Sequence, residues 1–169
     1  MTAPETLFGA ALFKGLPDGT LSALAIRGRT RYFPADAVLM EQGEVSNCMH
    51  IIVSGRVLIE RSHPALPQPV LLANIGPGEV VGEMGLFDGQ PRSATVTAAE
   101  ATETLELGAA VVAQTLLEAP EVATALLSIL SQRLRTTDAL VAEAIRKGWL
   151  DAALNAAGEG PTLPPALSQ

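Results

Sequence analysis

The stretch from Gly76 to Ala98 contains the residues whose types and spacing could do chemistry. It reads GPGEVVGEMGLFDGQPRSATVTA. Glu83 provides a carboxylate at the start of an expected single helical turn, and Arg92 provides a guanidinium just before a β-branched strand. The first N–H groups of such a turn have no acceptor within it and favour an anion. These groups around one small space suit a ligand with hydroxyls on one side and a phosphate on the other.

Glycine and serine residues surround the two charged groups. Gly82 and Gly85 allow the backbone to approach a ligand closely, because they lack a Cβ atom. Ser93 can add a hydroxyl beside the guanidinium. Glu79 and Glu83 could act as paired carboxylates, but no His, Cys or activated Ser accompanies them, and Glu79 is explained more simply as a turn residue. The pattern therefore indicates binding, and we do not expect an enzyme.

The composition of the chain bounds the class of protein. It has 169 residues, of which 48% are hydrophobic and 4% aromatic, so one domain with an aliphatic core is expected. The net charge of −7 and eleven scattered Lys and Arg disfavour a nucleic-acid-binding surface. One cysteine and two scattered histidines provide no metal-ligand spacing. With no leader and no apolar run of about 18 residues, we expect a cytoplasmic protein outside the membrane.

The elements that position the stretch are predicted from apolar periodicity. Residues 1–28 are expected to form N-terminal helices, the last of which begins near Pro17. Between residues 29 and 108 the period changes to two and turn residues recur, which predicts about eight short strands. We expect an α+β fold, an antiparallel, jelly-roll-like β-roll flanked by helices. The expected strands are Thr30–Phe33, Ala37–Met40, Met49–Ser54, Arg56–Glu60, Val70–Ile75, Glu79–Val81, Ser93–Thr97 and Thr104–Leu107.

Residues 109–150 are predicted to be helical. One helix covers Ala109–Glu118, and a long one begins at Pro120 and ends near Lys147 or Trp149, roughly 40–45 Å away at 1.5 Å per residue. Apolar residues alternate along it at spacings of three and four, which favours a homodimer; alternatively, the helix folds back on its own domain. This seam consists of Leu127, Leu130, Leu134, Thr137, Val141 and Ala144, and an adjacent stripe expected to pack on the roll consists of Leu126, Ile129 and Leu140.

The stretch 76–98 resembles the phosphate-binding cassette of cyclic-nucleotide-binding domains. The resemblance extends from about Leu12 to Glu143, and Gly43 and Gly55 fall where that family has turns of its β-roll. It implies a regulatory domain that binds a cyclic nucleotide. The segments that match are GPGE at 76–79, GEMGLF at 82–87 and PRSATV at 91–96.

The resemblance implies roles for individual residues of the cassette. Glu83 would accept the ribose 2′-hydroxyl, and Arg92 with Ser93 would bind the cyclic phosphate. Bacterial activators with Arg-Ser at this position bind cAMP, so cAMP is favoured over cGMP. In one alternative, Glu83 and Arg92 pair with each other in a pocket that has lost its ligand. In another, the chain is an interaction module whose pocket is empty or holds another anion, such as a cyclic dinucleotide. The ligand-binding candidates are Gly82, Glu83, Met84, Gly85, Arg92, Ser93 and Thr137, with Val81, Thr136 and Asp138 as further candidates.

The long helix is implied to hold the base of the nucleotide. Its segment RLRTTD, residues 133–138, resembles the corresponding helix of the catabolite activator type. Thr137 then falls where a threonine contacts the adenine amino group, and Asp138 where the partner subunit contributes. If this match to the family is shifted by one residue, Thr136 takes the place of Thr137 as the contact to the base. Thr137 could also be a tolerated polar residue of the seam. Trp149 is a further alternative, either as a lid over the base or as packing at the helix end.

The chain departs from the catabolite activator type after this helix. That type continues into a helix-turn-helix DNA-binding domain, whereas residues 151–169 here are Pro-rich and expected to be disordered. We therefore expect no DNA binding. The chain either stands alone and signals by a change of its own shape or of its protein partner, or it is the regulatory part of a longer protein. The ligand is expected to shift the position of the long helix.

Overall fold

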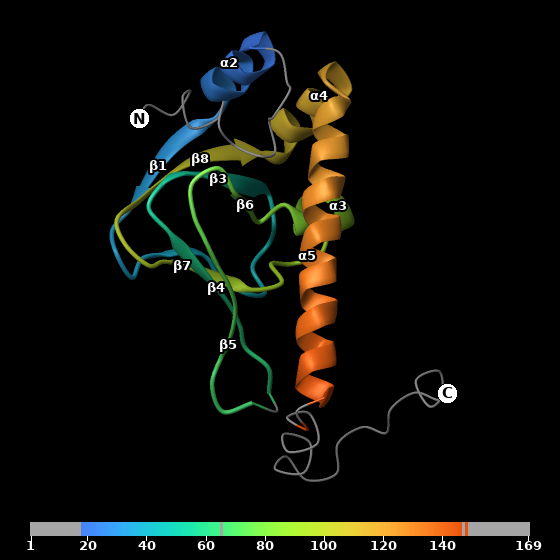
Figure 1. Ribbon diagram of the computed structural model, residues 1–169. Helices are drawn as coiled ribbons and strands as arrows, with labels where there is room; N and C mark the ends of the chain where they lie inside the picture. The colour runs from blue at the N-terminus through green and yellow to red at the C-terminus, as the bar shows by residue number, and fades with distance from the viewer. Residues whose placement is uncertain (1–17, 65, 147, 149–169) are drawn as a thin grey trace.

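The computed structural model of the chain describes residues 18–64, 66–146 and 148. Within them the chain forms one helix, then eight strands with a short helix before the seventh, then two helices (Figure 1), which confirms the predicted α+β fold. The predicted helices before residue 18, Trp149 and the tail 151–169 lie outside the described residues. The elements are α2 (Asp18–Arg27), β1 (Arg29–Phe33), β2 (Val38–Met40), β3 (Cys48–Ser54), β4 (Val57–Arg61), β5 (Val70–Ile75), β6 (Val80–Val81), α3 (Met84–Asp88), β7 (Thr95–Ala98), β8 (Thr102–Gly108), α4 (Ala109–Glu118) and α5 (Glu121–Arg146).

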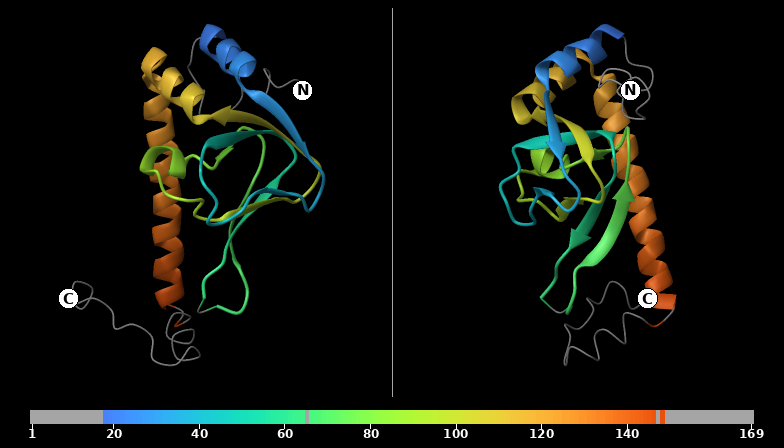
Figure 2. Two further views of the ribbon diagram at one scale, coloured as in Figure 1. Left: turned by 180° about the vertical axis from the view of Figure 1, so that it is seen from behind. Right: turned by 90° about the vertical axis from the view of Figure 1, so that its left-hand side faces the viewer.

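The strands form two antiparallel four-stranded sheets (Figure 2). One sheet has the order β1-β8-β3-β6, and the other has the order β2-β7-β4-β5. In β3, Met49 and Ile51 belong to a core cluster shared with the helices, whereas Ile52 belongs to a second cluster inside the roll. Because successive side chains of a strand point to opposite faces, burial on both faces explains the apolar run Ile51–Val53 of β3.

Helices cover the outer face of the first sheet. Leu24 of α2, Val112 of α4 and Leu126 of α5 pack in one buried cluster with Met49 and Leu105 of the sheet. Both α4 and the start of α5 are therefore fixed by apolar burial, which is the main source of helix stability in proteins. The second cluster, inside the roll, consists of Met40, Ile52, Val57, Ile75, Val81 and Val96.

α5 runs along one side of the roll and continues beside the β4–β5 hairpin (Figures 1 and 2). Leu126 is buried and Ile129 packs against the core, as predicted for the stripe that faces the roll. Leu140 of the same stripe is 58% exposed and lies outside the core cluster, but it lines the pocket between α5 and the roll that is described below. Exposed Leu127, Leu134 and Val141 repeat every seven residues on α5.

No single helix in the described ranges is long and apolar enough to cross a membrane; α4 and α5 pass that test of length and composition only as a pair, across a bend of 116°.

Leu126→Ala tests the packing of α5 on the roll. Leu126 is 3% exposed within the core cluster, so its truncation should lower the free energy of unfolding by about 2–5 kcal/mol. Leu117→Ala on α4 is the matched control, because Leu117 is 84% exposed, and it should change that free energy by less than about 0.5 kcal/mol. Urea denaturation followed by circular dichroism measures both. Equal effects of the two substitutions would contradict this packing.

Candidate functional site

A pocket of about 430 Å³ lies between the roll and α5. Its walls come from β5, β6, the cassette and the middle of α5. The volume lies in the range of small-molecule sites. The predicted site residues that line it are Val81, Gly82, Glu83, Met84, Gly85, Arg92, Ser93, Thr136 and Thr137. Asp138 is exposed and is not among the lining residues of this chain.

Arg92 is buried and rigidly held in the wall of the pocket. Its Nη1 donates to the carbonyl oxygen of Gly82 at 2.7 Å and to Oγ of Ser46 at 2.8 Å, and its Nη2 donates to Sγ of Cys48 at 3.3 Å. Its backbone N–H donates to the carbonyl oxygen of Glu44 at 2.8 Å. Of the five N–H donors of a guanidinium, the one on Nε and one on Nη2 have no acceptor in the described ranges. These two remain for an anion.

Glu83 is buried beside the start of α3 and pairs with α5. Only 1% of this residue is exposed, and its Oε1 accepts from Nη1 of Arg133 at 2.6 Å. Nη2 of Arg133 donates to the carbonyl oxygen of Val80. The alternative in which Glu83 pairs with Arg92 is therefore wrong. Oε2 of Glu83 accepts no hydrogen bond from the described part of the chain, so this carboxylate oxygen can still accept one from a ligand.

Arg133 is a charged site residue that the sequence analysis missed. It lies four residues before Thr137 on α5, and residues at this spacing share one face of a helix. The helical period could therefore have indicated it. Ser46 and Cys48, which hold Arg92, gave no such signal, because they precede it by more than forty residues in the chain and reach it only through the fold.

The two threonines of α5 both reach the pocket. The Thr136 hydroxyl donates to the carbonyl oxygen of Gln132 at 3.1 Å, and the Thr137 hydroxyl donates to that of Arg133 at 3.0 Å. Each hydroxyl oxygen can still accept a hydrogen bond. The choice between the two as the contact to a base stays a prediction, as does the alternative at Trp149, which lies outside the described residues.

The glycines of the cassette make room for its polar side chains. Gly82 has φ +78°, and a Cβ there would lie 2.5 Å from Nη1 of Arg92. A Cβ on Gly85 would collide with the Cβ of Ser46. Met84 is 49% exposed and Oγ of Ser93 lies 3.8 Å from its Sδ, so these two form the more open side of the pocket. That the glycines let a ligand approach stays a prediction.

Other charged groups support this arrangement. Oε2 of Glu79 accepts a hydrogen bond from the N–H of Gly76 at 2.8 Å, which confirms Glu79 as a turn residue.

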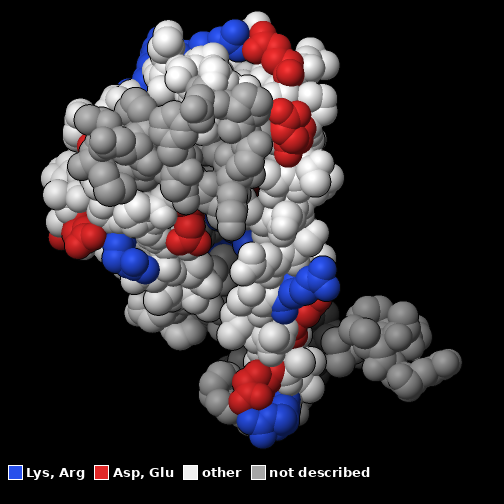
Figure 3. All heavy atoms as spheres, turned by 45° about the horizontal axis from the view of Figure 1, so that its top comes forward, with Lys and Arg blue, Asp and Glu red and all other residues white. Residues whose placement is uncertain are grey.

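On the face drawn in Figure 3, acidic and basic side chains are interspersed, and neither kind forms a broad patch. In the pocket, the guanidinium of Arg92 provides a fixed positive charge for an anion.

A double-mutant cycle on Glu83→Gln and Arg133→Ala tests their ion pair. Removing Arg133 leaves a buried carboxylate without its cation, so Arg133→Ala should lower the free energy of unfolding by roughly 1–3 kcal/mol. The same substitution should lower it by a smaller amount when Glu83 is already Gln. Arg146→Ala is the control on the same helix: its pair with Glu143 is also 2.6 Å long but exposed, and should be worth less than about 0.5 kcal/mol. Chemical denaturation measures each variant. Strict additivity would contradict the pair.

Comparison with known proteins supplies the family. Residues 30–119 match the family described as cyclic nucleotide-binding domain. The chain is 29% identical over 141 residues to the CRP-like cAMP-activated global transcriptional regulator of Mycobacterium tuberculosis, covering 83% of this chain and 62% of that one. It is 34% identical over 130 residues to the cyclic AMP receptor protein of Thermus thermophilus, covering 77% and 60%.

A solved structure shows the same fold. The catabolite activator protein of Thermus thermophilus superimposes with a TM-score of 0.72 at 32% identity, covering 78% of this chain and 62% of that chain. The chain thus spans about three fifths of the length of these relatives. The match over residues 30–119 includes the cassette and the roll, and it shows that the chain belongs to the cyclic nucleotide-binding domain family.

Proposed function

We propose that this chain is a regulatory module that binds a cyclic nucleotide, with cAMP favoured over cGMP. One observation carries the proposal: Glu83 and Arg92 are both buried in the wall of one pocket, and each has hydrogen-bonding capacity that its partners in the described part of the chain leave unused. Burying such groups is costly unless they are partnered. Their present partners satisfy them in part, and a ligand with a hydroxyl and an anionic phosphate would complete the set.

The nucleotide is expected to lie across the pocket from the roll to α5. Its ribose hydroxyl donates to Glu83, and its cyclic phosphate accepts from Arg92 and Ser93 with the first N–H groups of α3. The base reaches α5 at Thr137, or at Thr136. The preference for cAMP rests on the pair Arg92-Ser93 and on two similar proteins whose names refer to cAMP.

Binding is expected to act through the position of α5. Arg133 joins this helix to Glu83 and Val80, so a ligand that engages Glu83 changes the balance of contacts on α5. A ligand shifts such an equilibrium by its difference in affinity for the two helix positions. The proposal includes no catalytic reaction, because the site residues are assigned only to binding the nucleotide. The cytoplasmic setting and an unidentified protein partner remain part of the proposal.

Isothermal titration with cAMP and cGMP tests the function. The wild type should bind cAMP more tightly than cGMP. Arg92→Ala should weaken cAMP binding about 100-fold, since two charge-assisted hydrogen bonds are lost. Arg56→Ala is the matched control: Arg56 is exposed, donates to Asn74 and does not line the pocket, so affinity should be unchanged.

Thermal unfolding gives an independent measure on the same variants. At about 100 times its dissociation constant, cAMP should stabilise the wild type by about 2.7 kcal/mol and Arg92→Ala hardly at all. Circular dichroism verifies that Arg92→Ala is folded. If it is not, the same titrations are made with Arg92→Lys, which keeps the positive charge. Binding of a cyclic dinucleotide alone, or of none of the three ligands, would contradict the proposal.

We further propose that α5 forms a homodimer. Leu127, Leu134 and Val141 are 64%, 62% and 49% exposed and repeat every seven residues, which is the spacing of a coiled-coil seam. This stripe turns away from the core cluster, so it is free to pack against a second α5.

Sedimentation of Leu134→Lys tests the dimer. A buried lysine in the seam should convert the dimer to a monomer at micromolar concentration, because its charge would lose water without gaining a partner. Ala139→Lys adds the same charge at an exposed position about 140° around the helix from Leu134, and should leave the dimer intact. A wild-type monomer, or a dimer unaffected by Leu134→Lys, would contradict the proposal.

A further inference from the structure

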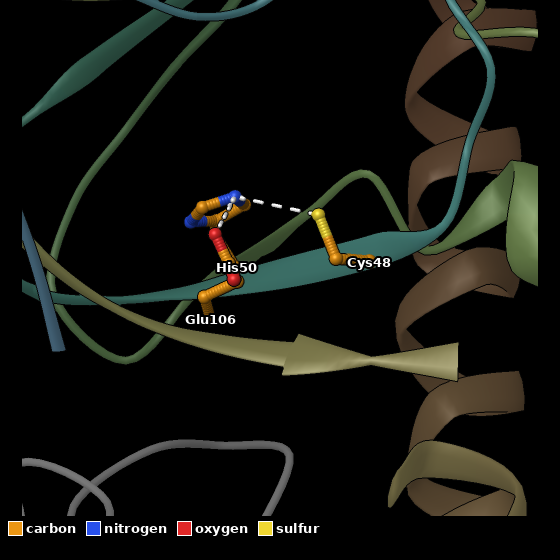
Figure 4. Close-up of side chains that lie close together, drawn as sticks. All are labelled: Cys48, His50 and Glu106. Atoms are coloured by element: carbon orange, nitrogen blue, oxygen red, sulfur yellow. Dashed lines mark hydrogen bonds and ion pairs between the residues drawn. The ribbon is translucent and has the colours of Figure 1, made fainter. Parts of the chain in front are cut away.

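Three side chains with metal-ligating atoms lie together inside the roll (Figure 4). Cys48 and His50 are two residues apart on β3 and so point to the same face of the sheet. His50 stands directly opposite Glu106 in the β3–β8 ladder. The sulfur of Cys48, a ring nitrogen of His50 and a carboxylate oxygen of Glu106 all lie within 4.8 Å of one another. None of the three lines the pocket described above.

The separations between these atoms suit a shared ion. Nε2 of His50 lies 3.8 Å from Sγ of Cys48 and 4.0 Å from Oε2 of Glu106. The second distance is too long for a hydrogen bond. Ligand atoms around a tetrahedral Zn²⁺ lie roughly 3.3–3.6 Å apart, as its bond lengths require. The three atoms, which lie within 4.8 Å of one another, would draw together to reach that spacing, and the Glu106 side chain, which is 22% exposed, has room to move.

His50 is already oriented as a ligand. Its side chain is 4% exposed, and its Nδ1 lies 2.9 Å from the hydroxyl of Thr104. This bond fixes the ring and leaves Nε2 facing Cys48 and Glu106, as outer hydrogen bonds do in metal sites.

Two guanidiniums flank the cluster and narrow the class of ion. Nη2 of Arg92 donates to Sγ of Cys48 at 3.3 Å, and Nε of Arg31 lies 3.8 Å from Oε2 of Glu106. Their positive charge opposes any cation, and burial raises the pKa of the Cys48 thiol although the charge of Arg92 lowers it. Ions held mainly by charge, such as Mg²⁺ and Ca²⁺, are therefore disfavoured. An ion that gains affinity from thiolate and imidazole bonding is the one that fits.

We propose that Cys48, His50 and Glu106 bind one thiophilic divalent ion of the Zn²⁺ class, with the fourth position open to water. Coordination replaces the thiol proton of Cys48, which passes to solvent. The spacing of these residues along the chain predicts no metal site, because Glu106 reaches the other two only through the pairing of β3 with β8.

The ion would lie next to Arg92, which also lines the nucleotide pocket. Metal and anion binding should then change each other's affinity by the same factor. This consequence rests on the proposed function, whereas metal binding itself does not.

A Co²⁺ titration of the whole chain without nucleotide tests the proposal. Cys48 is the single cysteine of the sequence, so any thiolate-to-cobalt charge-transfer absorption must come from it. We expect this band to saturate at one equivalent of Co²⁺, to be abolished by one equivalent of Zn²⁺ and to resist excess Mg²⁺. Cys48→Ser should abolish it. Because no nucleotide is present, failure here is distinct from failure of nucleotide binding.

Variants of His50 and Glu106 show whether the ion is bound by all three residues or by the Cys48 thiol alone. Glu106→Gln and His50→Gln should each weaken Co²⁺ and Zn²⁺ binding by about tenfold or more, while His63→Ala, which changes the other histidine of the sequence, should not. Circular dichroism verifies that each variant is folded. If His50→Gln does not fold, the test relies on Glu106→Gln, because Glu106 is partly exposed. Absence of the band in wild type, or unchanged affinity in Glu106→Gln, would overturn the proposal.

Discussion

The ion pair between Glu83 and Arg133 is the interaction on which the arrangement of the site depends. It joins the start of α3 to the middle of α5, two segments fifty residues apart in the chain, at 2.6 Å and with Glu83 almost fully buried. Pairs of this kind are costly to break, because the partner that remains is a buried charge. The long helix is anchored in this way to the cassette, in addition to the apolar contacts at its N-terminal end.

Burial and preorganisation together explain how an acidic protein can bind an anion. Arg92 is fixed by Ser46, Cys48 and the carbonyl of Gly82 before any ligand arrives, so little side-chain entropy is left to lose on binding. The same contacts connect the pocket to the polar cluster around His50 inside the roll. One guanidinium therefore lies between two places where ligands are proposed, a nucleotide pocket and a metal site.

Local chemistry made much of the fold predictable. The helix over Ala109–Glu118 and strand Val70–Ile75 were predicted with their observed bounds, because turn residues and apolar period change sharply there. The cassette residues that line the pocket were predicted because they are close together in sequence. Ser46 and Cys48, which hold Arg92, were not predicted, since pairing across the fold leaves no local pattern. Arg133, the partner of Glu83, was missed although the helical period places it on the same face of α5 as Thr137. Leu140 lies on the predicted face, at the pocket, but outside the core cluster, because the helical period shows a face and not how far the core extends along it.

The central claim is that Glu83 and Arg92 hold opposite sides of one nucleotide. A crystal structure of the chain grown with cAMP tests this most directly. The account predicts the cyclic phosphate within hydrogen-bond distance of Arg92, the ribose hydroxyl on Glu83 and the base against α5. Density for the nucleotide elsewhere, or bound in the pocket with neither residue in contact, would contradict it.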